Sequence, residues 1–187
     1  MFRTYLGLGF DHILDPNGYD HILFVVTLCA IYAASNWLRV LILVTAFTIG
    51  HSVTLALSTL DIVRISPDWV ETLIPITIIL TALYNFYKIE DDGSRLGWHY
   101  FLAAFFGLIH GLGFSNFLKA LLGKEENILT PLLAFNLGVE IGQIVIVIVT
   151  VGFAYVLVKY LQFPRKYWVW IISGLSILIS LHLLIKG

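Results

Sequence analysis

The chain has 187 residues, of which 59% are hydrophobic and only 12% are charged, and its formal net charge is −1. Soluble domains average about 45–50% apolar and about 25% charged residues, so this composition excludes a water-soluble enzyme. The near-neutral charge argues against a nucleic-acid partner, which needs a basic face, and the single cysteine, Cys29, excludes any site built on several thiolates. The class that remains is a polytopic membrane protein.

Six apolar segments, separated by short polar connections, are candidates for membrane-spanning helices. A helix needs about 20 mainly apolar residues to cross the roughly 30 Å hydrocarbon core of a bilayer. In chain order the segments are Tyr19–Ala34, Trp37–Leu60, Pro67–Tyr87, Trp98–Leu122, Pro131–Leu161 and Tyr167–Ile185. We therefore expect an all-α fold, with residues 1–187 forming a single integral-membrane domain of six transmembrane helices in a lipid bilayer.

The first segment is unusually short. Tyr19–Ala34 would extend roughly 24 Å at 1.5 Å per residue, which is less than the hydrocarbon thickness. Its start is then expected to lie below the interface on the side where this topology places the N-terminus, here called side A; the opposite side is called side B. The preceding stretch, Phe10–Tyr19, is expected to dip into the protein, and Asp20 and His21 to open the helix there. Lys and Arg are divided almost equally between the two sides, so no orientation is predicted.

Ionisable residues inside spans are costly and mark functional sites by default. His51 and Glu140 are each expected roughly 14 Å from side A and His110 roughly 18 Å, counting 1.5 Å per residue from the helix ends. With Asp20 and His21, five donors from four segments fall in one half of the bilayer. Imidazole and carboxylate ligands suit nickel, zinc, cobalt or iron, so the sequence predicts a divalent-metal site.

Neighbouring polar residues are expected to orient these ligands. Asn136, Glu140 and Gln143 share one helix face at spacings of i, i+4 and i+7, and Thr48 and Ser52 flank His51. The pairs Gly138/Gly142 and Gly107/Gly111 predict closely packed helices, which would bring His110 within reach of Glu140.

Structural roles remain open for several of these residues. His51, His110 and Glu140 could each be a hydrogen-bonded packing residue, and Glu71 could only complement the dipole of its helix. His99 and His182 are expected near the membrane interface. Asn85, at the side-B end of its span, suits a cap as well as a functional role.

Five motifs, some of them made of two pieces, resemble those of a known family. They are His12–Leu14 with Gly18–Phe24, Phe47–Leu55, Val70–Glu71 with Asn85, Gly107–Phe114 and Phe135–Gln143. With these segments the sequence resembles the HupE/UreJ family of bacterial membrane proteins. The spacing His12-x7-Asp20-His21 is two residues longer than the usual His-x5-Asp-His of that family, so His12 is placed among the orienting residues rather than the ligands.

The resemblance implies a permease of the bacterial cytoplasmic membrane for nickel or cobalt, and the ligand types also admit zinc. It implies metal contacts at Asp20, His21, His51, His110 and Glu140. Orienting roles are expected for His12, Thr48, Ser52, Glu71, Asn136 and Gln143. Metalloenzyme-maturation proteins and a second copy of the chain are the protein partners left open.

Two other functions stay open at this stage. A metal-dependent, zinc-type intramembrane hydrolase could act on a lipid-borne or amphipathic substrate, with Ser52 steadying an oxyanion and Glu71 or Glu140 acting as general base. A metal-binding assembly factor that transports nothing is the other.

Overall fold

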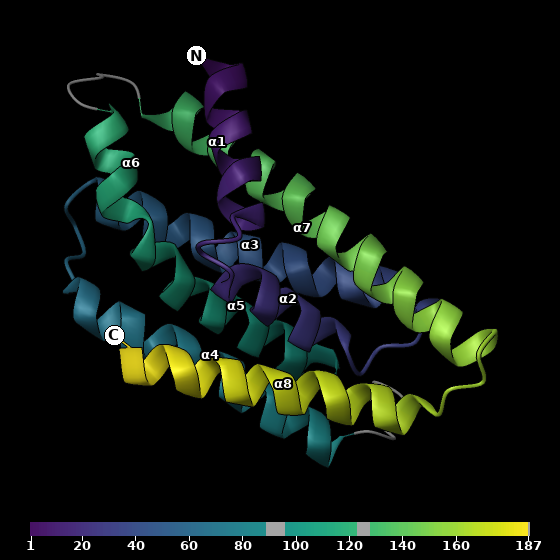
Figure 1. Cartoon of the computed structure of the whole chain (residues 1–187). Helices are drawn as coiled ribbons and strands as arrows, with labels where there is room; N and C mark the ends of the chain where they lie inside the picture. The colour runs from purple at the N-terminus through teal and green to yellow at the C-terminus, as the bar shows by residue number, and fades with distance from the viewer. Residues whose placement is uncertain (89–95, 123–127, 187) are drawn as a thin grey trace.

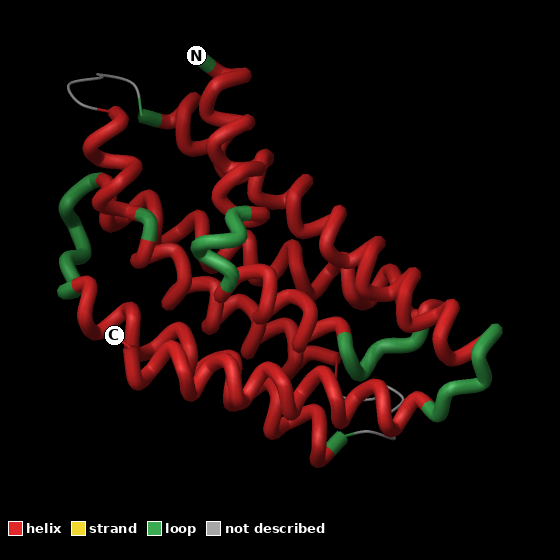
Figure 2. The backbone as a smooth tube through the Cα atoms, viewed as in Figure 1, coloured by secondary structure: helices red, strands yellow, loops and turns green. Residues whose placement is uncertain are grey.

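The computed structural model describes residues 1–88, 96–122 and 128–186, and within these ranges every regular element is a helix (Figure 2). The helices are α1 (Phe2–Leu14), α2 (Asp20–Cys29), η1 (Ala34–Asn36), α3 (Trp37–Thr59), α4 (Pro67–Tyr87), α5 (Leu96–Gly113), α6 (Ser115–Leu122), α7 (Leu129–Lys159) and α8 (Arg165–Lys186). They form a membrane-type bundle in which α2 contacts α1, α4, α7 and α8 (Figure 1).

The all-α membrane fold predicted from the sequence is confirmed, with a different number of spans. In the described residues, η1 with α3, α4, α7 and α8 are each long and apolar enough to cross a membrane, which gives 4 spans. The pair α5 and α6 would make a fifth span, although its two halves meet at a bend of 51°. The expected count of six is therefore too high.

The first predicted span, Tyr19–Ala34, does not form a helix long enough to cross a membrane. Its helix, α2, has only 10 residues, about 15 Å of helix. The chain leaves the helix after Cys29, and the side chain of Arg165 at the start of α8 donates a hydrogen bond to the freed carbonyl of Ile31. That bond, with the turn hydrogen bond from Tyr32 N–H to the Cys29 carbonyl, satisfies backbone groups that a longer helix would have paired internally.

The N-terminal segment is helical over most of its length, contrary to the expectation of a non-helical dip over Phe10–Tyr19. Helix α1 continues to Leu14, and only residues 15–19 lie outside helices. The reversal uses turn chemistry, since Asp15 Oδ1 accepts the Asn17 backbone N–H at 2.8 Å and Pro16 stands between them. This short turn leads from the last turn of α1 directly to the first residue of α2.

The fourth predicted span is broken at Phe114. The Phe114 ring packs 4.0 Å from the ring of His12 and 4.8 Å from that of Phe135, between centroids, so the chain bends where this side chain turns inward. Beyond the bend, the ammonium group of Lys119 donates to Asp61 Oδ1 at 2.6 Å. This hydrogen bond lowers the pKa of the Asp61 carboxyl below its ordinary value and joins α6 to the connection between α3 and α4.

Glycines set the two most extensive helix contacts. A Cβ at Gly50, Gly107 or Gly111 would overlap a backbone carbonyl oxygen across the α3/α5 interface. At the α1/α7 interface, a Cβ at Gly9 would overlap the Phe135 carbonyl and one at Gly138 the Leu6 carbonyl. The glycine pairs do allow close approach, as predicted, but they join α5 to α3 and α7 to α1 rather than α5 to α7.

Candidate metal centre

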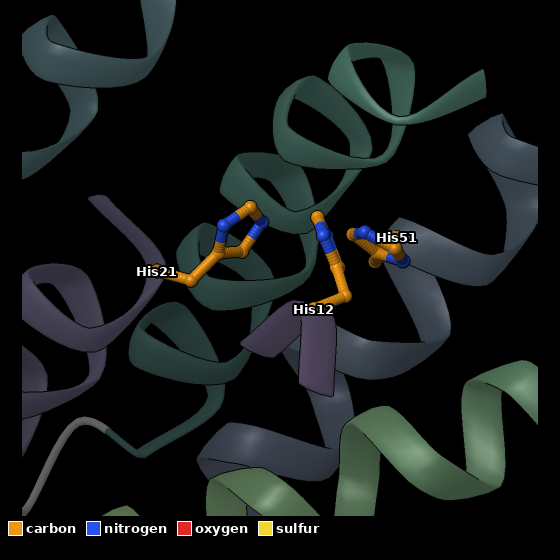
Figure 3. Close-up of side chains that lie close together, drawn as sticks. All are labelled: His12, His21 and His51. Atoms are coloured by element: carbon orange, nitrogen blue, oxygen red, sulfur yellow. The ribbon is translucent and has the colours of Figure 1, made fainter. Parts of the chain in front are cut away.

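Three imidazoles from three helices meet in the half of the bundle nearer side A. His12 lies in the last turn of α1, His21 in the first turn of α2 and His51 in the second half of α3. One nitrogen of each ring lies within 4.8 Å of one nitrogen of both others. The three ring centroids form a triangle with sides of 4.6, 6.1 and 6.1 Å, and Figure 3 shows the three side chains gathered from their separate helices. We call these three residues the imidazole group.

Four ring nitrogens of the imidazole group have no close hydrogen-bond partner in the protein. Nε2 of His12, Nε2 of His21 and both ring nitrogens of His51 are buried and unpartnered. Native structures pair about nine in ten or more of their buried polar groups, so several orphaned nitrogens in one place indicate a missing binding partner. Two nitrogens that share one zinc ion at about 2.0–2.1 Å each are at most about 4.2 Å apart, so small side-chain rotations would close the imidazole group on a cation.

Asp20 fixes the orientation of His21. His21 Nδ1 donates to Asp20 Oδ1 at 3.0 Å, and the same oxygen accepts the His21 backbone N–H at 2.8 Å. Because a carboxylate only accepts, the ring proton sits on Nδ1, which leaves the Nε2 lone pair available. A carboxylate that holds the outer nitrogen of a histidine is the usual support of a metal-ligating imidazole.

His110, on α5, adjoins the imidazole group on its side-B edge. Its ring centroid lies 5.2 Å from that of His21, and its Nε2 is 3.0 Å from Thr77 Oγ1. The Thr77 hydroxyl donates its one proton to the Ile74 carbonyl at 2.7 Å, so His110 Nε2–H donates to Thr77. The buried Nδ1 of His110 has no partner and offers a fourth nitrogen lone pair beside the imidazole group.

Glu140 lies with its neighbours along the contact between α3 and α7. Its Oε1 accepts the Thr45 hydroxyl at 2.5 Å, and its buried Oε2 has no partner. Nearby, the Thr48 hydroxyl donates to Gln143 Oε1 at 2.7 Å. Thr45 precedes His51 by six residues on α3, about 9 Å along the helix, so Glu140 pairs with α3 at another level from the three histidines.

The remaining predicted orienting residues have local partners or line the approach to the site. Asn136 donates to the Leu132 carbonyl at 2.9 Å within its own helix, and its side chain also lies beside the His51 ring. The Ser52 hydroxyl donates to the Thr48 carbonyl at 2.6 Å, also within its own helix. Glu71 is exposed at the side-A end of α4. The imidazole group therefore gathers His12, His21 and His51, with Asp20 and His110 in contact with His21.

A cavity of about 210 Å³ opens onto the site from side A. Its lining includes His12 and His21 together with three carboxylates, those of Asp15, Asp20 and Glu71. A second, more open cavity also reaches His12 and is lined by Asp11 and Asp15. Carboxylates along both approaches raise the local concentration of cations.

Two further histidines, His99 and His182, differ in their exposure. His182 is exposed near the end of α8. His99, near the start of α5, is buried, and its two ring nitrogens are hydrogen-bonded to the hydroxyls of Tyr32 and Tyr84. Asn85 is buried too and donates to the Thr27 carbonyl at 2.8 Å and to Ser173 Oγ at 3.2 Å.

Sequence reasoning placed His12 outside the ligand set because of its longer spacing to Asp20. The turn Asp15-Pro16-Asn17-Gly18 takes up those residues and returns the chain toward His12. The signal was present, since a Pro-Asn-Gly cluster predicts a chain reversal, and a reversal brings the residues on its two sides together.

Comparison with known proteins identifies the family to which this chain belongs. The family described as HupE / UreJ protein matches residues 1–185. The searches of curated proteins and of solved structures gave no match. With a match over essentially the whole chain, and with the several apolar helices of a multi-pass membrane protein, the chain belongs to the HupE/UreJ family.

Proposed function

We propose that residues 1–187 form one integral-membrane domain that carries a divalent transition-metal cation across the bacterial cytoplasmic membrane. The observation that carries the proposal is the imidazole group, whose buried, unpartnered nitrogens come from three separate helices. Neutral imidazole is a ligand for nickel, cobalt and zinc alike. The family favours nickel or cobalt as the cargo, and the histidine ligands also admit zinc.

The cation enters from side A. Asp15, Asp20 and Glu71 line the cavity that leads to His12 and His21, so a hydrated cation meets carboxylates before it meets nitrogen ligands. In this account Glu71 acts at the entrance, and Asp20 both attracts the cation and holds the His21 ring.

Buried polar groups on one face of α4 supply the onward path. Thr77, Thr81 and Asn85 are spaced at i, i+4 and i+8, about 12 Å of helix, and Thr77 already accepts a hydrogen bond from His110. Thr27 and Ser176, which share a hydrogen bond of 2.6 Å, lie beside the far end of this row, where Asn85 donates to the Thr27 carbonyl. The row begins at His110 and leads toward side B.

Metal flux into proteoliposomes tests the proposal. Purified protein is reconstituted into vesicles that contain a metal-sensitive dye, and nickel, cobalt or zinc is added outside. We expect dye quenching that requires the protein and disappears when His12, His21 and His51 are all alanine. Absence of metal-dependent flux under gradients of either direction would contradict the permease function.

The path along α4 makes a separate prediction. The double variant Thr77→Val/Thr81→Val is nearly isosteric but removes both hydroxyls, and we expect it to slow flux about tenfold or more, since each lost polar contact costs a desolvated cation about 1.5–3 kcal/mol. Equilibrium metal binding should change much less. Thr72→Val, an exposed threonine of the same helix, is the control. Equal flux in the double variant and in wild type would exclude this path.

Asp20 makes a second prediction, since it touches His21. Loss of an orienting partner of a metal ligand typically costs 10–100-fold in affinity. We expect Asp20→Asn to weaken metal binding by about that factor, less than His21→Ala, when both are measured by titration calorimetry at one pH. A loss as large as that of His21→Ala would instead make Asp20 a direct ligand.

A membrane hydrolase remains the second candidate because the imidazole group faces an open cavity with a carboxylate, Glu71, on its wall. Three histidines and one open position are also what a catalytic zinc site needs. The other residues expected to act in that chemistry are engaged elsewhere, with Ser52 bonded to the Thr48 carbonyl and Glu140 to Thr45. This arrangement favours transport over hydrolysis.

A further inference from the structure

A cavity of about 280 Å³ lies at the side-B end of the bundle, away from the imidazole group. It forms where three parts of the chain meet: the connection between α2 and α3, the last turns of α7 and the first turn of α8. Figure 1 shows the end of α7 and the start of α8 together at this end of the molecule. We propose that this cavity binds a phosphate group, namely that of an anionic phospholipid headgroup.

Buried donors without acceptors carry the proposal. Arg165 Nε and Trp168 Nε1 are both buried and lack a hydrogen-bond partner, and both residues line this cavity. Trp168 is only 7% exposed. An indole N–H and a guanidinium N–H can only donate, so what is missing is an acceptor, and phosphate oxygens are strong acceptors that arginine binds well.

The charges around the cavity have one sign. Lys159 and Arg165 are its charged lining residues, and no carboxylate lines it among the residues that the structure describes. The Lys159 ammonium donates to the Tyr155 hydroxyl and lies 4.8 Å from the centre of that ring. Neither cation has a carboxylate partner within the described ranges. An anion would therefore meet two positive charges and no repulsion.

The rest of the wall suits a lipid better than a free ion. Small apolar side chains make up much of it: Ala30, Ala33, Ala34, Ala154 and Val158. Exposed aromatic residues surround this end of the bundle, including Tyr160, Tyr167 and Trp170, as at the interface between membrane and water. Basic pockets between transmembrane helices at this level are typical sites for anionic headgroups. The occupant then has a phosphate at Arg165 and apolar chains along the helices.

Native mass spectrometry of the full chain in detergent tests this assignment, with phosphatidylglycerol, phosphatidylcholine and inorganic phosphate as separate probes. We expect phosphatidylglycerol to be retained at least about tenfold better than phosphatidylcholine. The reason is that Lys159 and Arg165 each attract the net negative charge of phosphatidylglycerol by about 1 kcal/mol. Competition by millimolar inorganic phosphate would identify the phosphate group as the main determinant. No competition would show that the acyl chains are needed as well. Both results fit the assigned site.

Substitutions of the residues that line the cavity test where the lipid binds. Lys159→Gln/Arg165→Gln should abolish the preference for phosphatidylglycerol, and Trp168→Phe, which removes only the indole donor and keeps an aromatic ring, should lower the retention of phosphatidylglycerol severalfold. Lys166→Gln is the matched control, because Lys166 follows Arg165 directly but lies over the Trp170 ring and does not line the cavity. Equal retention of both lipids by wild type, or an equal effect of Lys166→Gln and the double variant, would overturn the proposal.

Discussion

Replacing His51 with alanine is expected to lower the affinity for nickel, cobalt and zinc by more than about 100-fold. Loss of a residue that only orients a ligand costs about 10–100-fold, and His51 would supply a ligand atom itself. Both of its ring nitrogens are buried without a close hydrogen bond, and the Asn136 side chain is the polar neighbour that its removal would leave behind. Titration calorimetry on purified protein gives the affinity directly.

His182→Ala is the matched control for this substitution. His182 is an exposed histidine of α8, so its loss should leave the affinity unchanged. His21→Ala and His12→Ala should each behave as His51→Ala does. If His12→Ala costs only about tenfold, within the range of an orienting residue, then the ligand set would be His21 and His51 with another donor, for which His110 Nδ1 is the nearest candidate.

The second large effect is expected at a glycine. Gly107→Ala places a methyl group against the Phe47 carbonyl oxygen of α3, and the His51 backbone nitrogen lies 3.0 Å from the added Cβ. Neither atom belongs to a flexible side chain, so α3 and α5 must move apart. Overpacking costs about 1–3 kcal/mol, which corresponds to a fall of roughly 2–12 °C in Tm for a chain of this size. Because His51 and His110 lie on these two helices, metal affinity should fall as well.

Gly97→Ala is the control within the same helix. A Cβ at Gly97 meets no atom within 4 Å, and alanine in a helix is otherwise favoured over glycine by about 0.5–1 kcal/mol. Its Tm should therefore stay the same or rise slightly, in thermal unfolding followed in detergent. If Gly107→Ala were as stable as Gly97→Ala, the close approach of α3 and α5 would be wrong.

The sequence predicted which residues matter better than it predicted how they meet. His51 and His110 stood out because an ionisable side chain within an apolar segment needs a partner. Counting residues gives depth along a helix but not the direction in which a side chain points relative to other helices. Glu140 shows the limit, since its depth and the glycine pairs predicted that it would reach His110, whereas its carboxylate pairs with Thr45.

The N-terminal helix could not be predicted from its own composition. A helix as short as α1 is marginal in isolation, and here its stability comes from packing against α7, where Gly9 fits on the Phe135 carbonyl. The bend at Phe114 was hidden for a related reason. Hydropathy continues through it, and the cause is a ring packed against His12 and Phe135, residues far away in the sequence.

The central claim is that the imidazoles of His12, His21 and His51 hold the cation. The zinc K-edge absorption spectrum of the protein loaded with one zinc ion per chain tests it most directly. We predict nitrogen ligands at about 2.0–2.1 Å with the multiple-scattering pattern of imidazole, a pattern that is lost when the three histidines are replaced by alanine. A spectrum with oxygen ligands only, or one that is identical in the wild-type protein and the triple variant, would contradict the account.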